Sequence, residues 1–179
     1  FAFDLEFLLR LELDPVILLC GADAIRMREL LFAGPHPFSA FPIDMAGGHA
    51  EDPTPRILEF LDDCRKRSRV MVLVDPSTPL EDALMRTVPS VSRRVHLIRV
   101  RGPLHDANNE ALAYHYTQRE DRVELAEPDR ETADLAGRLL RHAPGTHISV
   151  ASPLQLLQEL FTVKGAGCVI RPGAEIGHF

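Results

Sequence analysis

The chain has 179 residues, of which 45% are hydrophobic and 26% charged, and its formal net charge is -6 at pH 7. This length and composition fit one globular domain with a sizeable core, and the acidic balance gives no general attraction to nucleic acid or anionic lipid. The three cysteines, Cys20, Cys64 and Cys168, have no CxxC spacing, which is typical of reduced thiols and excludes a disulfide framework.

Two further kinds of pattern are missing from the sequence. The eight histidines show no HxxH or HExxH spacing, so we expect no metal site. No apolar run approaches the length of a membrane-spanning helix, and no signal-peptide pattern is visible. We therefore expect a cytoplasmic protein with neither a membrane nor a nucleic acid as its partner. Phe1 is not an initiator Met, so we expect that the chain starts inside a longer protein or that the sequence is processed.

The first part of the chain alternates helical and strand patterns. Asp23 can cap the second helix, and Thr54-Pro55 gives an N-cap followed by proline at the first helical position. In chain order, the predicted elements are a helix over 1–13, a buried strand over 15–20, a helix over 24–32, a loop with a short edge strand over 40–43, and a helix over 54–66.

The alternation continues to the end of the chain. Thr78-Pro79 and Ser152-Pro153 repeat the pattern of a cap followed by proline. In chain order, the patterns predict a strand over 69–75, a helix over 79–86, a strand over 95–100, a turn over 102–109, a strand or broken hairpin over 111–117, a helix over 131–141, a strand over 146–150, a helix over 153–161 and a strand over 167–170.

Strands that alternate with helices throughout a chain indicate the α/β class. We therefore expect a three-layer αβα sandwich with a mainly parallel central sheet. No internal repeat, charge block or low-complexity segment divides the sequence. We expect one domain over residues 1–179.

The stretch LLQELFTVKGAGCVIRPG, from Leu156 to Gly173, places a lysine and a Gly-Ala-Gly between a predicted helix and a predicted strand. Gly165 can end the helix in a left-handed conformation, and Lys164 lies where a cation favours the negative helix end. Gly167 allows a close approach of two backbones before the strand. On these grounds alone the stretch is a helix cap that closes the sheet.

The run ELFTVKGAGC at 159–168 resembles the C-terminal signature of the amino-acid kinase domain in N-acetylglutamate kinases and N-acetylglutamate synthases of arginine biosynthesis. That signature reads Glu-(Leu/Ile)-Phe-Thr followed by Gly-x-Gly-Thr, and Cys168 stands here in place of the last Thr. Residues 4–22 are similar to the family's early helix, strand and glycine loop, and residues 95–106 to a turn of its nucleotide-binding half. The resemblance implies an amino-acid-kinase-like fold.

The sequence also departs from the family's kinases. Their Lys-x-Gly-Gly strand is absent, and there is no lysine between Lys66 and Lys164. Their His-Gly-Gly-Gly loop is replaced by a degenerate phosphate loop, in which an aspartate would repel phosphate. The residues of this loop are Cys20, Gly21, Ala22 and Asp23. Phosphoryl transfer depends on positive charge and carboxylate-held metal, so we expect no catalytic residue and no phosphotransferase activity.

The resemblance implies a binding site for feedback L-arginine. Glu159 can accept a guanidinium through a bidentate, charge-assisted pair, and loop backbone groups can hold the ligand's carboxylate and ammonium. The residues implied are Glu159, Phe161, Thr162, Gly165 and Gly167. The expected role is that of a regulatory or oligomerisation domain, a homo-oligomer with no cofactor of its own, that binds L-arginine or an acetylglutamate-like molecule. An acetyltransferase domain that uses acetyl-CoA is expected to follow in the full-length protein.

Three alternatives remain open at this stage. Glu159 could be a solvated residue at a helix end. The chain could be a residual N-acetylglutamate kinase or another amino-acid-binding transferase, or a stand-alone doubly wound nucleotide-binding protein. The arginines at 93, 94, 99 and 101 form a basic cluster, which we interpret as a solvated edge, with an anionic ligand or a partner's carboxylates as the alternative.

Overall fold

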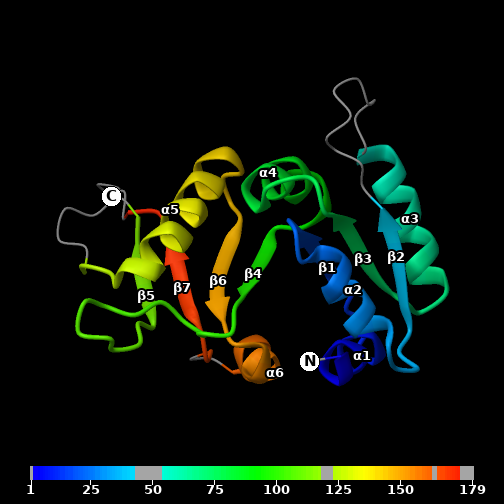
Figure 1. Cartoon of the computed structure of the whole chain (residues 1–179), viewed down its shortest axis with the longest axis horizontal. Helices are drawn as coiled ribbons and strands as arrows, with labels where there is room; N and C mark the ends of the chain where they lie inside the picture. The colour runs from blue at the N-terminus through cyan, green and yellow to red at the C-terminus, as the bar shows by residue number, and fades with distance from the viewer. Residues whose placement is uncertain (1, 43–53, 118–122, 163–164, 174–179) are drawn as a thin grey trace, which may run out of the picture. The chain divides into compact units, whose positions relative to one another are not determined.

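The computed structural model describes residues 2–42, 54–117, 123–162 and 165–173 (Figure 1). The chain divides into two compact units, Phe1–Val91 and Ser92–Phe179. Each unit has its own sheet, and each is described below by itself. The single domain expected over residues 1–179 stays a prediction, because two compact units can belong to one domain.

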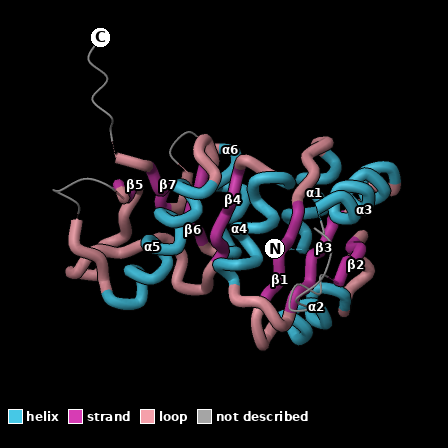
Figure 2. The backbone as a smooth tube through the Cα atoms, turned by 90° about the horizontal axis from the view of Figure 1, so that it is seen from above, coloured by secondary structure: helices cyan, strands magenta, loops and turns pink. Residues whose placement is uncertain are grey.

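The first unit is a parallel sheet with helices on both sides (Figure 2). The strand order is β1-β3-β2, and both neighbouring pairs are parallel. Its elements are α1 (Ala2–Arg10), β1 (Val16–Cys20), α2 (Ala24–Phe32), β2 (Phe38–Pro42), α3 (Thr54–Lys66), β3 (Val70–Asp75) and α4 (Leu80–Val91).

The central strand β3 explains the core of the first unit. All six of its residues are buried, because strands lie on both edges and helices cover both faces. On one face, Met71 and Leu73 of β3 form a cluster with Ile57, Leu61 and Cys64 of α3. This double burial is why residues 70–75 are a continuous apolar run without alternation.

The second unit contains a mixed sheet with the strand order β4-β6-β7-β5. The outer pairs, β4 with β6 and β5 with β7, are parallel, and the central pair β6 with β7 is antiparallel. Its elements are β4 (Arg94–Ile98), β5 (Tyr114–Tyr116), α5 (Glu127–His142), β6 (His147–Ala151), the 3-10 helix η1 (Pro153–Gln155), α6 (Leu156–Phe161) and β7 (Cys168–Arg171).

The α/β class and the mostly parallel pairing agree with the prediction from sequence. The strands form two sheets within the described residues, whereas one central sheet was expected. Apolar runs show that a strand is buried but do not show which strand it pairs with, so the division was not visible in the sequence. No helix of the described ranges is both long and apolar enough to cross a membrane.

Two helices run beyond their predicted ends. The helix expected to stop near Arg86 continues as α4 to Val91 and contains Pro89. Its buried face includes Thr87 and Val88, and burial of that face outweighs the hydrogen bond that proline cannot donate. The helix expected over 131–141 begins earlier, at Glu127, and has a proline in its first turn.

Candidate functional site

The Gly-Ala-Gly segment between α6 and β7 is held by one carboxylate. Glu159, in α6, accepts two hydrogen bonds on the same oxygen. The backbone N–H of Ala166 donates to Oε2 at 2.8 Å, and that of Gly167 donates at 2.7 Å. Glu159 is partly buried, so it is not the solvated helix-end residue that one alternative described. It organises the segment that follows its own helix.

Both glycines make room for this carboxylate. Gly165 has φ +65°, and a Cβ there would lie 2.6 Å from Oε2 of Glu159. A Cβ at Gly167 would lie 3.0 Å from the same oxygen and 2.6 Å from the backbone oxygen of Val150. A Cβ at residue 167 would clash with backbone that cannot easily move, so this position requires glycine, while the positive φ of Gly165 favours glycine there. The close backbone approach predicted for Gly167 is confirmed.

The end of α6 agrees with the prediction. The helix ends at Phe161 as expected, Thr162 is an extended C-cap, and Gly165 is left-handed. The N–H of Gly165 donates to the carbonyl oxygen of Thr162 at 3.1 Å, which closes the turn. Lys164 lies outside the described residues.

The five residues implied for arginine binding therefore lie along one short stretch. Glu159, Gly165 and Gly167 are in mutual contact. Thr162 joins them through its carbonyl oxygen, while its hydroxyl donates to the carbonyl oxygen of Gln158 at 2.8 Å. Phe161 keeps a half-exposed side chain at the end of α6. The stretch thus combines a carboxylate, backbone polar groups and an accessible aromatic ring.

Two residues near Glu159 were not singled out in the sequence. His96 of β4 lies opposite Ser149 of β6, and its Nδ1 is 2.8 Å from the serine Oγ. Burial lowers the pKa of His96 below its ordinary value of 6.5, and the charge of Arg94 adds to this, although the charge of Glu159 opposes it. The imidazole is therefore neutral near pH 7. Only the strand register brings these side chains together, and sequence does not give the register.

Cys168, which replaces the threonine of the resembled signature, lies next to this segment. The residue is fully buried in β7. Burial raises the pKa of its thiol to about 12. A thiol with so high a pKa is protonated at pH 7 and behaves as a small core residue rather than a nucleophile.

The degenerate phosphate loop, residues 20–23 at the end of β1, differs in structure from the Gly-Ala-Gly segment. Gly21 has φ +77°, and its N–H donates to the backbone oxygen of Asp75 at 3.1 Å. Asp23 precedes α2, but its side chain makes no capping hydrogen bond, so the predicted cap is wrong. The exposed Asp23 and the buried Asp75 place two carboxyl groups at this end of the sheet.

Asp75 itself has one satisfied and one unsatisfied oxygen. Its Oδ1 accepts from the N–H and hydroxyl of Ser77 and from the N–H of Thr78, at 3.0–3.2 Å. Its Oδ2 is buried and has no hydrogen-bond partner within the described residues. Burial raises the pKa of the neighbouring Cys20 thiol, and the charge of Asp75 raises it further. The negative charge that raises the Cys20 pKa also disfavours an anionic ligand in this loop.

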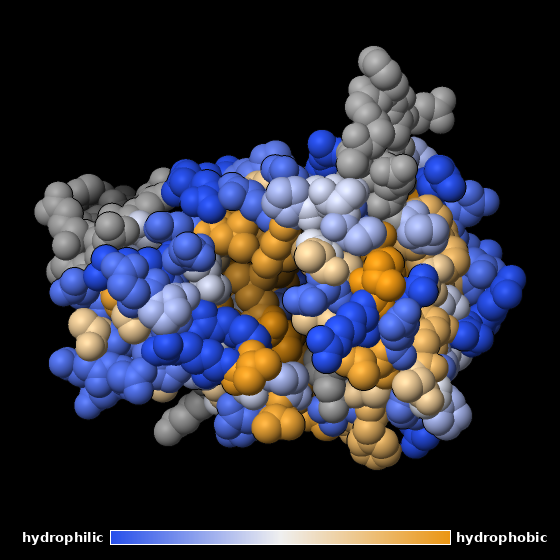
Figure 3. Space-filling view, viewed as in Figure 1, coloured by the Kyte–Doolittle hydropathy of each residue, from blue (hydrophilic) through white to orange (hydrophobic). Residues whose placement is uncertain are grey.

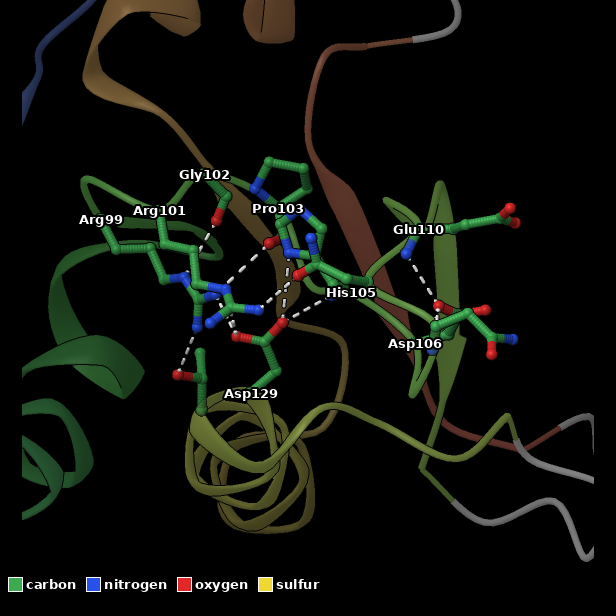
Figure 4. A network of polar contacts seen from close by, with 11 residues as sticks. Arg99, Arg101, Gly102, Pro103, His105, Asp106, Glu110 and Asp129 are labelled. Carbon is green, nitrogen blue, oxygen red and sulfur yellow. Dashed lines mark hydrogen bonds and ion pairs between the residues drawn. The ribbon is translucent and has the colours of Figure 1, made fainter.

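The basic cluster of the second unit is partly internal. Arg99 is an ion-pair partner of Asp129, a fully buried residue in the first turn of α5 (Figure 4). Arg99 also donates to the carbonyl oxygen of Gly102 at 2.9 Å and to the hydroxyl of Thr132 at 3.0 Å. The interpretation of a solvated edge is therefore wrong for Arg99, because the sequence did not reveal the carboxylate that faces it.

The second oxygen of Asp129 binds the turn after β4. Its Oδ2 accepts from the N–H of His105 at 2.6 Å and lies 3.3 Å from the Nδ1 of the same residue. Arg101 approaches Oδ1 at 3.7 Å and donates to Asn109 at 2.8 Å. Asp129 thus ties residues 99–105 to the start of α5, as the dashed contacts in Figure 4 show.

The ionised carboxylate of Asp129 should make the free energy of unfolding depend on pH in the acid range. Burial alone would raise its pKa, but hydrogen bonds from Arg99 and His105 and the charges of Arg99 and Arg101 outweigh burial and hold the pKa below the ordinary 3.8. The resulting stabilisation is complete above about pH 4 and is lost as the pH falls through the lower folded-state pKa. Asp129→Asn should remove this part of the acid dependence. Urea unfolding at a series of pH values below about 4 measures it, and equal slopes for both proteins would contradict the assignment.

No group of three or more histidine, cysteine, aspartate or glutamate side chains within the described ranges could hold a metal ion. No protein-family model matches the chain, and a comparison with curated proteins gives no match.

Proposed function

We propose that the chain is a kinase-like, non-catalytic regulatory or oligomerisation domain of an N-acetylglutamate-synthase-like protein, and that it binds L-arginine beside Glu159. The fold would be a three-layer sandwich of the amino-acid kinase type. The parent protein would be an amino-acid N-acetyltransferase that uses acetyl-CoA in a following domain. The observation that carries the proposal is the carboxylate of Glu159, which two backbone N–H groups fix through one of its oxygens.

The geometry supports a guanidinium ligand in a specific way. A carboxylate has about four lone-pair sites, and the two N–H bonds of the loop occupy only Oε2. Within the described residues, Oε1 accepts no hydrogen bond, so it can accept from a guanidinium N–H. The bond would be charge-assisted, and Glu159 would not have to release the loop.

The loop after β1 supports the non-catalytic part of the proposal. The resemblance equates residues 20–23 with the phosphate loop of the kinases, and the carboxyl groups of Asp23 and Asp75 lie at this end of the sheet. A phosphate there would meet like charge instead of only backbone N–H donors. A residual kinase would therefore have to bind its nucleotide against this charge.

Glu159→Gln tests the proposal with little change to the fold. Glutamine keeps a carbonyl oxygen that can accept from Ala166 and Gly167, but it removes the charge. We expect L-arginine affinity to fall by about 1.5–3 kcal/mol, or about 10- to 150-fold. Isothermal titration calorimetry measures the affinity, and thermal unfolding verifies that the variant is folded.

Glu131→Gln is the matched control. Glu131 lies on an exposed part of α5, so the same loss of charge there should leave arginine affinity unchanged. Unaltered affinity in folded Glu159→Gln would refute the binding site. Equal losses in both variants would show that only the net charge matters.

A further inference from the structure

Strands β4 and β6 carry a short row of polar and apolar side chains on one face. His96 lies opposite Ser149, and Ile98 lies opposite Ala151. Where Figure 1 places the two strands, Figure 3 shows apolar side chains beside hydrophilic ones. Residues two apart on a strand point to the same face, so these four residues lie together, and we refer to them as the β4–β6 strip.

Glu159 lies at one end of the β4–β6 strip. A Cβ at Gly167 would lie 3.0 Å from Oε2 of Glu159 and 3.1 Å from the Cβ of Ala151, so the carboxylate and Ala151 border the same small space. Burial lowers the pKa of His96, and the charge of Glu159 opposes this shift, which agrees with a carboxylate close to the imidazole. At the other end, the exposed Arg94 precedes His96 by two residues on β4. The strip therefore runs from a negative end to a positive end.

The hydrogen bond between His96 and Ser149 determines which nitrogen of the imidazole is a free donor. Ser149 is buried, and within the described residues its hydroxyl has no partner other than Nδ1 of His96, at 2.8 Å. When the hydroxyl donates to Nδ1, the neutral imidazole carries its proton on Nε2. Nε2 has no hydrogen-bond partner in the described part of the chain, and it is not sealed from solvent. Its N–H can therefore donate to a ligand.

We propose that L-arginine lies along the β4–β6 strip, with its guanidinium on Glu159 and its α-carboxylate on the Nε2–H of His96. The positive guanidinium then meets the negative end of the strip, and the negative carboxylate meets the positive end. Neighbours on one face of a strand are about 7 Å apart, which an extended arginine side chain spans. The apolar Ile98 and Ala151 lie between the two polar ends and suit its methylene groups. This inference rests on the proposed function and adds the residue that recognises the amino-acid end of the ligand.

Agmatine, which is arginine without its carboxylate, tests this placement. In parallel calorimetric titrations we expect the unaltered chain to bind L-arginine at least about 10-fold more tightly than agmatine, as for a hydrogen bond to a charged group. His96→Leu removes the donor and should abolish most of this preference, while the affinity for agmatine stays unchanged. A merely structural role of His96 would weaken both ligands alike and leave the preference as it was.

A second variant and a matched control accompany His96→Leu. Ser149→Ala keeps the imidazole but removes the hydroxyl that orients its proton, so we expect a preference for L-arginine between those of His96→Leu and the unaltered chain. His147→Leu is the control, because His147 is exposed and lies two residues before Ser149 on β6, on the side away from Glu159. Both affinities should stay unchanged there. Thermal unfolding verifies that each variant is folded.

The outcomes separate this inference from the proposed function. Equal affinities for L-arginine and agmatine in the unaltered chain would overturn the placement, whereas Glu159→Gln would still decide the guanidinium site. A preference for L-arginine that survives in folded His96→Leu and Ser149→Ala would overturn the role of His96. A preference lost in His147→Leu as well would overturn the local assignment. No saturable binding of L-arginine at all would overturn the proposed arginine site together with this inference.

Discussion

Asp129→Ala should be the most damaging single change in the second unit, with an expected loss of about 3–5 kcal/mol in the free energy of unfolding. The carboxylate is fully buried and meets Arg99, Arg101 and His105. Its removal leaves the Arg99 guanidinium, which is itself mostly buried, without its counter-charge. It also leaves the N–H of His105 without its acceptor, and the cost of an unpaired buried group is added to the lost attraction.

Urea unfolding monitored by circular dichroism measures this loss, and Asp134→Ala provides the control. Asp134 lies on the same helix but is exposed, so its removal should change stability by no more than about 0.5 kcal/mol. If Asp129→Ala cost less than about 1 kcal/mol while Asp134→Ala behaved as expected, the network would not hold the turn after β4 to α5. Arg99→Met would then also be harmless.

Gly167→Ala should be the most damaging change at the α6–β7 loop. The new Cβ would lie 2.6 Å from the backbone oxygen of Val150 and 3.1 Å from the Cβ of Ala151. These atoms belong to strand β6 at the centre of the sheet, so the backbone has to shift. We expect a loss at the upper end of the usual 1–3 kcal/mol or so for overpacking. The N–H bond from residue 167 to Glu159 should weaken at the same time.

Gly145→Ala separates the clash from the general cost of replacing glycine. Gly145 has φ +84°, and a Cβ at this position would meet no other atom within 4 Å, so only backbone strain of about 1–2 kcal/mol applies. Denaturant unfolding gives both stabilities, and calorimetry with L-arginine gives the binding. Gly145→Ala should keep arginine affinity and Gly167→Ala should lose it. A Gly167→Ala protein as stable as the unaltered chain would show that the close approach to Val150 is not constraining.

The sequence predicted the elements well where one local pattern was decisive. The β3 run was recognisable because a strand that is buried on both faces has no polar alternation. The helix over 24–32 was predicted with its observed ends. The start of α5 was missed because its first turn, Glu-Pro-Asp-Arg, is polar and has no apolar periodicity. The helix includes this polar first turn because Asp129 within it is buried and pairs with Arg99.

Contacts between distant residues could not be predicted in the same way. Glu159, Gly165 and Gly167 were chosen from a resemblance, and the structure gives the physical reason why they occur together: the carboxylate needs the space that the two glycines leave. The pairing of His96 with Ser149 depends on the register of β4 and β6, over 53 residues of separation. Likewise, the arginines at 99 and 101 looked solvated because Asp129 lies 30 and 28 positions further along the chain.

The central claim is that Glu159 recognises the guanidinium of L-arginine, and one calorimetric comparison tests it most directly. The unaltered chain is titrated with L-arginine and, in parallel, with L-citrulline, which has nearly the same shape but a neutral ureido group. We predict saturable binding of L-arginine and binding of L-citrulline at least about 10-fold weaker, as expected for a charge-assisted hydrogen bond. Equal affinities for the two ligands, or no saturable binding of L-arginine, would contradict the claim.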